Sequence, residues 1–257
     1  MSQAVSGRTA VVTGAGNGLG RAICLALAAQ GAHVILVGRD GAKLGRVAQE
    51  LVQSDASVKA VPCDVSDVAA VAEMRAQLSR DDISILVNNA GIGGPVAHLT
   101  EIDPAAWDEV FDINVRSVFL MCRALLPAMI ARGGGDIINI ASVTGKRPLP
   151  GRTPYAASKM AVIGLTATLA HEVGPLGVMV NSLSPGPVRG ARMDRNFSLE
   201  AARRGMTKHE VQEEFVSRSA LRRMIEEEEV AAAVLAILTM RGMTAADIDL
   251  SAGMVAR

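Results

Sequence analysis

The chain has 257 residues, which is long enough for one α/β domain with a sizeable buried core. Its 26 lysines and arginines balance its 26 aspartates and glutamates, so no overall electric field attracts nucleic acid or an anionic membrane. The residues are 49% apolar and only 2% aromatic, so the core must consist of aliphatic side chains.

The cysteines and the apolar segments bear on the compartment. Cys24, Cys63 and Cys122 are far apart and lie in apolar segments, which predicts small buried side chains rather than a disulfide or a metal site. Residues 1–8 contain no long apolar core, so we expect no secretory signal. We expect no apolar run long enough to cross a bilayer, and we expect a cytoplasmic protein.

A glycine-rich loop follows the first predicted strand. Residues 8–13 form a short β-branched run, and a helix with apolar spacing is predicted over residues 21–30. A strand, a glycine loop and a helix in this order are the context of a dinucleotide fingerprint, because the backbone can approach a pyrophosphate at the helix N-terminus. An ordinary glycine-rich turn is the alternative. The residues that we expect to hold the pyrophosphate are Gly14, Gly16, Asn17, Gly18, Leu19 and Gly20.

Strands and helices alternate along the rest of the chain. This alternation predicts one doubly wound parallel sheet, and the sequence shows no repeat or linker that would divide it. Further strands are expected over residues 33–37, 58–62, 83–87, 137–140, 178–183 and 248–250, and further helices over 42–51, 66–78, 104–131, 155–172 and 226–238.

Two polar residues stand at informative places in this pattern. Asn114 lies within the long predicted helix between apolar Ile113 and Val115, where its amide must find hydrogen-bond partners. Ser142 follows the strand at residues 137–140, and open α/β sheets bind ligands at the carboxyl ends of their strands.

Tyr155 is the only tyrosine, and it precedes Lys159 by four residues. Pro154 suits the first turn of a helix, on which positions i and i+4 share a face. A neighbouring ammonium and the helix N-terminus both favour an ionised phenol, so this pair could exchange a proton at working pH. A half-buried tyrosine beside a solvated lysine is the alternative for such a short motif.

Residues 189–224 form a charged insertion after the sixth predicted strand. We expect it to be helical and to act as a lid above the strand ends.

Taken together, these motifs resemble the classical short-chain dehydrogenases/reductases over the whole chain. The matching residues are the loop at 13–20, Asp64, Val65, Asn88, Asn89, Ala90, Gly91, Asn114, Ser142, the segment 155–159, Pro185 and Gly186. The resemblance implies a single Rossmann-type NAD(P)-binding domain over residues 1–257, with about seven parallel strands. It also implies a homotetramer, or a homodimer, that transfers a hydride between nicotinamide and a secondary alcohol or ketone.

The resemblance also implies roles for individual residues. Tyr155 would be the general acid/base, Ser142 would bind the substrate oxygen, Lys159 would bind the nicotinamide ribose, and Asn114 would hold a water in the proton relay. Beyond the glycine loop, the expected cofactor contacts are Arg39, Asp64, Val65, Asn89, Ala90, Gly91, Tyr155, Lys159, Pro185, Gly186 and Val188. The chain departs from the family pattern at residues 249–254, which leaves the details of assembly open.

The choice of cofactor depends on the end of the second strand. Gly38 stands where NAD-specific relatives carry an acidic residue, and Arg39 follows it, which favours NADP because an arginine suits a 2′-phosphate. NAD remains an option if Asp40 binds the ribose. The alternative for Asp40 is a helix N-cap.

The substrate is expected to be a small alcohol or carbonyl compound, which could be anionic. Candidate substrate contacts are Thr144, Arg152, Arg192 and Met193. The cations that suggest an anion are Lys146, Arg147, Arg152, Arg189, Arg192, Arg195, Arg203 and Arg204. Solvated helix faces are the alternative, and Met193, Phe197 and Met206 would then line the pocket. Two other functions stay open: reduction of 3-oxoacyl thioesters, and a non-catalytic dinucleotide-binding regulator.

Overall fold

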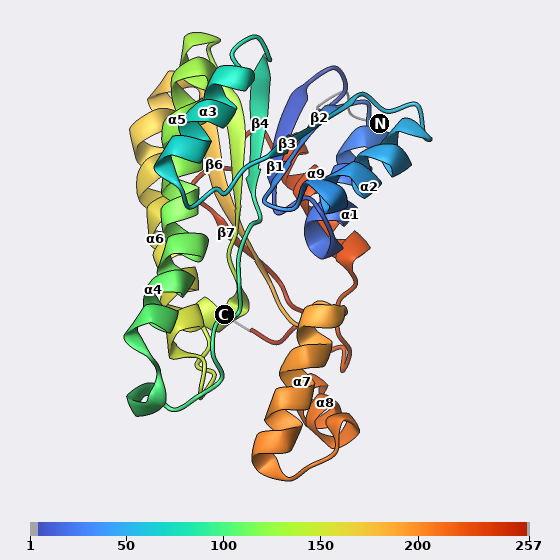
Figure 1. Ribbon diagram of the computed structural model, residues 1–257, viewed down its shortest axis with the longest axis vertical. Coiled ribbons are helices and arrows are strands. Elements are labelled where there is room, and N and C mark those ends of the chain that lie inside the picture. The colour runs from blue at the N-terminus through green and yellow to red at the C-terminus, as the bar shows by residue number, and fades with distance from the viewer. Residues whose placement is uncertain (1–4, 256–257) are drawn as a thin grey trace.

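A seven-stranded parallel sheet forms the centre of the computed structural model, which describes residues 5–255 (Figure 1). Residues 1–4 and 256–257 lie outside the described residues. The expectation that residues 1–8 carry no secretory signal therefore falls partly outside them. The strand order is β3-β2-β1-β4-β5-β6-β7, and every neighbouring pair is parallel. The strands are β1 (Thr9–Thr13), β2 (His33–Gly38), β3 (Val58–Pro62), β4 (Ile83–Asn88), β5 (Gly135–Ile140), β6 (Val178–Pro185) and β7 (Asp247–Leu250). This confirms the predicted Rossmann-type sheet.

Helices cover both faces of the sheet (Figure 1). One face carries α1 (Gly18–Ala29), α2 (Gly41–Val52) and α9 (Glu227–Thr239), and the other carries α3 (Val68–Gln77), α4 (Pro104–Phe111), α5 (Ser117–Ala131) and α6 (Thr153–Val173). Each face has its own buried apolar cluster, built mainly from aliphatic side chains as the composition predicts. The strand order reverses between β1 and β4, which is where such sheets open a ligand crevice.

Two helices begin earlier than their apolar spacing predicts. Helix α1 begins at Gly18, inside the glycine loop, and α6 begins at Thr153 with Pro154 in its first turn. Apolar periodicity does not detect these first turns, because glycine, proline and polar residues form them.

The long helical stretch at residues 104–131 contains one irregular turn. Residues 112–116 form a π-helical turn between α4 and α5, and Asn114 lies within it. By length and composition this stretch could cross a membrane, with a mean hydropathy of 1.5 in its most apolar window. The expectation that no apolar run is long enough was therefore wrong. A helix in a protein core passes the same test, and 44% of that window is buried within the fold.

The charged insertion after β6 forms two helices, α7 (Ala191–Arg204) and α8 (Lys208–Val216). Gly205 in the left-handed conformation ends α7, and a capping box of Thr207 and Glu210 begins α8. The two helices extend beyond the body of the fold (Figure 1). Phe197, Ala201, Val211 and Met224 form a separate small apolar cluster there.

The three cysteines are buried and unpaired, as predicted. Burial raises the pKa of the Cys63 thiol to about 11 and that of the Cys122 thiol to about 12. Within residues 5–255, no group of three or more metal-ligating side chains is found.

A buried polar chain joins β4, β5 and α6. The Nδ2 atom of Asn88 donates to Oδ1 of Asn139 at 2.8 Å, and Nδ2 of Asn139 donates to Oγ1 of Thr166 at 2.8 Å. Asn139 is fully buried, so removing its amide leaves neighbouring polar groups without partners.

We therefore expect Asn139→Ala to lower the free energy of unfolding by about 1–3 kcal/mol for each polar group that is left without a hydrogen-bond partner. Thr166→Ser keeps the accepting hydroxyl and should cost less. Denaturant unfolding of both variants measures this, and an equal or larger loss for Thr166→Ser would contradict the assignment.

Candidate active site

A cavity of about 940 Å³ opens at the carboxyl ends of the strands and brings most of the predicted site residues together. Its walls come from the loop after β1, the ends of β4, β5 and β6, the first turns of α6, and α7. The predicted residues that line it are Gly14, Asn17, Gly18, Leu19, Gly20, Asn89, Ala90, Gly91, Ser142, Thr144, Arg152, Tyr155, Lys159, Pro185, Gly186, Val188, Arg192 and Met193. Gly16 lines an adjoining hollow, and Asn114, Arg39, Asp64 and Val65 lie outside the cavity wall.

The glycine loop is packed too closely for larger residues. A Cβ atom on Gly20 would lie 2.1 Å from the carbonyl oxygen of Gly14, and Gly14 itself has a φ of +66°. The loop backbone and the N-terminus of α1 therefore border the cavity closely, with the Glu227 carboxylate beside Gly18. This cradle suits a pyrophosphate, which binds to free N–H groups at a helix N-terminus.

Thr13 and Asn89 connect the loops after β1 and β4. Oγ1 of Thr13 accepts hydrogen bonds from the backbone N–H groups of Asn89 and Ala90, at 2.9 and 3.0 Å. Nδ2 of Asn89 donates to the carbonyl of Thr13 at 3.0 Å. These bonds fix the two loops against each other on either side of the point where the strand order reverses.

Asn114 finds the partners that its buried position requires. Its Oδ1 accepts from the N–H of Ile92 at 2.8 Å, and its Nδ2 donates to the Ile92 carbonyl and to Oγ of Ser158, both at 3.0 Å. Asn114 thus connects the loop after β4 to helix α6. The π-helical turn directs its side chain there, and such turns are frequent at functional sites.

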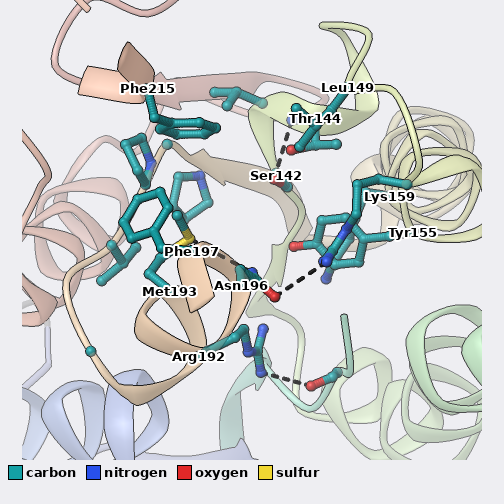
Figure 2. A pocket seen from close by; sticks show the side chains of 18 of the residues that line it. Ser142, Thr144, Leu149, Tyr155, Lys159, Arg192, Met193, Asn196, Phe197 and Phe215 are labelled. Carbon is teal, nitrogen blue, oxygen red and sulfur yellow. Dashed lines mark hydrogen bonds between the residues drawn. The ribbon is translucent and has the colours of Figure 1, made fainter. Parts of the chain in front are cut away.

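Ser142, Tyr155 and Lys159 meet at the cavity wall (Figure 2). Ser142 follows β5, is 7% exposed, and accepts a hydrogen bond from the N–H of Thr144 at 3.2 Å. Tyr155 and Lys159 lie one turn apart on α6, with the Lys159 Nζ atom 5.9 Å from the centre of the phenol ring. The predicted helix thus places the phenol and the ammonium side by side.

The Lys159 ammonium is buried and donates to the carbonyl of Ile140 at 2.7 Å. Burial, reinforced by the nearby Arg192 charge, lowers its pKa from 10.5 to about 7. A Cβ atom on Gly91 would lie 3.5 Å from this ammonium, so the ammonium borders the loop after β4.

Arg152 is the most buried residue among the predicted cations in the substrate region. It is 6% exposed, and its Cζ atom lies 5.4 Å from the centre of the Tyr155 ring. Its Nη1 atom donates to Oδ1 of Asn196 on α7 at 3.2 Å. Asn196 is labelled in Figure 2, where a dashed line leaves its amide oxygen.

Most of the other cations have carboxylate partners. Lys146 pairs with Asp247 and Asp249, Arg189 with Glu226, Arg203 with Glu200, and Arg204 with Glu214. The predicted local excess of positive charge is therefore smaller than the sequence count indicates, because Asp247 and Asp249 on β7, Glu214 on α8 and Glu226 before α9 lie outside the segment that was counted. Arg192 instead donates to the Gly91 carbonyl at 2.7 Å.

The ends of β2 and β3 lie side by side, with Gly38 paired to Pro62. Arg39 is exposed and its Nη1 atom lies 4.0 Å from Asp64 Oδ2. Asp40 caps α2 by accepting from the N–H of Lys43 at 3.1 Å, which confirms the N-cap alternative.

Three residues that the sequence did not single out contribute to the site. Ser158 bridges Asn114 to the Tyr155 carbonyl, Asn196 holds Arg152, and Met254 lines the cavity from the C-terminal segment. Ser158 stands inside the tyrosine–lysine motif and could have been found there. The other two depend on tertiary contacts that no local spacing predicts.

Comparison with known proteins agrees with this geometry. The family model described as short chain dehydrogenase matches residues 8–202. The chain is 39% identical over 229 residues to a protein assigned as ketoacyl reductase 1 of the granaticin polyketide synthase of Streptomyces violaceoruber, covering 88% of this chain and 84% of the relative.

Two solved structures have nearly the same fold. NAD+-bound xylitol dehydrogenase superposes with a TM-score of 0.93 at 28% identity, over 97% of this chain and 99% of its own. A variant of the actinorhodin polyketide ketoreductase with NADPH gives 0.92 at 29% identity, over 99% of each chain.

The chain therefore belongs to the short-chain dehydrogenase family. It is an oxidoreductase that uses a nicotinamide dinucleotide to interconvert an alcohol and a carbonyl group in a small-molecule substrate.

The buried Lys159 ammonium generates a pH prediction. Between pH 7 and 10.5 the unfolded chain holds a proton on Lys159 that the folded protein releases, so the free energy of unfolding should rise with pH. The rise from this group is at most about 1.4 kcal/mol per pH unit, and Lys159→Met should remove it. Denaturant unfolding at pH 7.5 and 8.5 measures the difference, and equal slopes for both proteins would contradict it.

Proposed function

We propose that Tyr155 is the general acid/base of this oxidoreductase and that Ser142, Lys159 and Asn114 complete its proton-transfer site. The observation that carries the proposal is the placement of the phenol beside a buried ammonium, on a cavity wall that Ser142 shares. Hydrogen-bond donors at Tyr155 and Ser142 would hold a carbonyl oxygen, and Tyr155 would deliver the proton to it as the alcohol forms.

The glycine cradle fits a nicotinamide dinucleotide, which supplies or accepts the hydride when it is bound. The loop at Gly14–Gly20 and the N-terminus of α1 would hold its pyrophosphate, Lys159 its nicotinamide ribose, and Pro185, Gly186 and Val188 would border the nicotinamide. Asn114 would keep the Ile92 backbone and Ser158 in position, and through them a water in the proton relay.

NADP is the cofactor that we propose. Arg39 is exposed at the end of β2, and its guanidinium suits a 2′-phosphate. Asp40, the alternative ribose ligand, already accepts the N–H of Lys43 as the cap of α2. Asp64 and Val65 at the end of β3 would border the adenosine.

The α7–α8 segment would act as the lid over the substrate, within a single domain that spans the chain. Met193, Phe197 and Phe215 face Ser142 and Tyr155 across the cavity (Figure 2). Phe197 and Phe215 pack edge to face, with ring centres 5.6 Å apart. The third predicted lining residue, Met206, does not line the cavity and packs against the small cluster of α7 and α8.

Reduction of 3-oxoacyl thioesters is the second candidate, supported by the two relatives whose names refer to ketoreductases. A non-catalytic regulator would have no use for the Tyr155 arrangement, which argues against it.

The assembly that we propose is a homotetramer or homodimer in the cytoplasm. Phe119 on α5 and Met160 on α6 are 50% and 47% exposed, and a second copy would cover such large apolar side chains. The cytoplasmic location rests on the packing of residues 104–131 into the fold.

Tyr155→Phe tests the catalytic assignment. We expect it to lower kcat for any carbonyl substrate by about 10²- to 10⁴-fold, the usual contribution of a general acid, while the Kd for the cofactor changes little. Lys159→Ala should lower kcat and also weaken binding of the cofactor. Turnover is followed by NAD(P)H absorbance and cofactor binding by calorimetry, and retention of most of the wild-type rate by Tyr155→Phe would falsify the assignment.

Gly38→Asp combined with Arg39→Leu tests the cofactor proposal. Loss of one charged hydrogen bond is worth about 1.5–3 kcal/mol, so kcat/KM with NADPH should fall by roughly 10- to 150-fold relative to NADH. Asp40→Ala, which removes only the helix cap, is the control and should lower stability without changing the preference. A wild type that already prefers NADH, with no change in the double variant, would refute the proposal.

A further inference from the structure

Arg152 differs from every other cation that lines the cavity. Its side chain is 6% exposed, and its Nε atom has no hydrogen-bond partner among residues 5–255. Its guanidinium contacts the amide oxygen of Asn196 and the face of the Tyr155 ring. Neither carries a full negative charge, and burial lowers the pKa of the guanidinium while leaving it charged.

Three carboxylates of the described residues line the cavity, and two of them pair with other arginines, while the third, Glu227, lies beside Gly18 and Gly190. Glu200 binds Arg203, and Glu214 binds both Arg204 and Arg218. Burial is the main cause of the lowered pKa of Arg152, the nearby Arg192 charge adds to it, and Tyr155 and Glu200 act in the opposite direction without forming an ion pair with the guanidinium. The cavity wall therefore holds a buried guanidinium whose Nε–H has no acceptor in the described part of the chain, with a second cation nearby.

A buried charge without an ion-pair partner is costly, and such costs persist at sites that bind ligands. The planar fork of arginine presents parallel donors that match a carboxylate. We propose that Arg152 binds a carboxylate of the substrate, so that this enzyme acts on hydroxy acids and the corresponding oxo acids. The inference rests on the proposed role of Tyr155 and adds a substrate class to it.

The position of Arg152 limits how far this carboxylate lies from the reacting carbon. The guanidinium carbon is 5.4 Å from the centre of the Tyr155 ring, and each hydrogen bond to the substrate spans about 2.8 Å. A substrate that reaches both groups carries its carboxylate only a few bonds from its carbonyl. This favours a compact oxo acid over a 3-oxoacyl thioester, whose carbonyl neighbours are a neutral thioester and an alkyl chain.

The bond from Arg152 to Asn196 adds a connection to the lid. Because Asn196 lies on α7, a carboxylate that draws the guanidinium toward itself also acts on the helix above the cavity. Asn196→Ala removes this bond and leaves the cation in place, so it separates lid positioning from anion binding.

The test compares oxo acids with their neutral esters. The probes are 3-oxobutanoate and 4-oxopentanoate, each paired with its methyl ester, and the readout is the ratio of kcat/KM for acid to ester. We expect a ratio well above one for the wild type. Arg152→Met should lower that ratio by about 10- to 150-fold, the effect of losing a charge-assisted hydrogen bond. Arg152→Lys keeps the charge without the planar fork, and its acid-to-ester ratio should lie between those of the wild type and Arg152→Met.

Binding gives a readout that is independent of turnover. Calorimetric titration of 4-oxopentanoate onto the protein saturated with oxidised cofactor should show a Kd at least tenfold lower for the wild type than for Arg152→Met. Asn196→Ala should affect acid and ester alike. A wild type that prefers the esters, or equal Kd values for wild type and Arg152→Met, would overturn the inference. Tyr155-dependent reduction of the esters would meanwhile leave the proposed catalytic role intact, so the two failures are distinguishable.

Discussion

The burial of one ammonium group constrains the whole site. Lys159 lies inside the fold, where a charged group must have a hydrogen-bond acceptor, and it finds one in the backbone carbonyl of Ile140. That carbonyl ends β5, so the bond holds the first turns of α6 against the carboxyl end of this central strand. Tyr155, one turn earlier on the same helix, is therefore held at the carboxyl ends of the strands, on the cavity wall that it shares with Ser142.

Asn114 imposes a second constraint on the same helix. Its amide satisfies both backbone groups of Ile92 and reaches Ser158, which in turn binds the carbonyl of Tyr155. A regular helix would not need the extra residue of the π-helical turn at 112–116. The π-helical turn interrupts the regular helical hydrogen bonds, and it lets Asn114 join the loop after β4, the α4–α5 stretch and α6 into one hydrogen-bonded unit.

The sequence predicted the fold and most of the cavity wall because these depend on local patterns. Strand and helix alternation determines a parallel sheet, and the glycine loop, Ser142, Tyr155 and Lys159 all follow from their positions at strand or helix ends. The predicted excess of cations near the substrate was too large because it depends on contacts between distant segments. The partners of Lys146 come from β7, about a hundred residues further along the chain, and the cation count near the substrate could not include them.

Other features were invisible to spacing for the same reason. No local pattern joins Arg152 to Asn196 or places Met254 beside the cavity, because these contacts form only when α7 and the C-terminal segment fold over the strand ends. The π-helical turn was also missed, since a continuous apolar pattern runs through it. Its signal was a single asparagine in a place where a helix core would exclude one.

The small cluster of Phe197, Ala201, Val211 and Met224 sets α7 and α8 apart from the rest of the molecule. These helices contact the body of the fold through Arg192 and Asn196 but contribute no residue to the two large clusters that hold the sheet together, so we expect that they can be exchanged as a unit if those two contacts are kept. Chimeras that carry this segment from a relative should therefore fold, and selection can diversify the substrate range of such an enzyme while its hydride-transfer machinery stays unchanged.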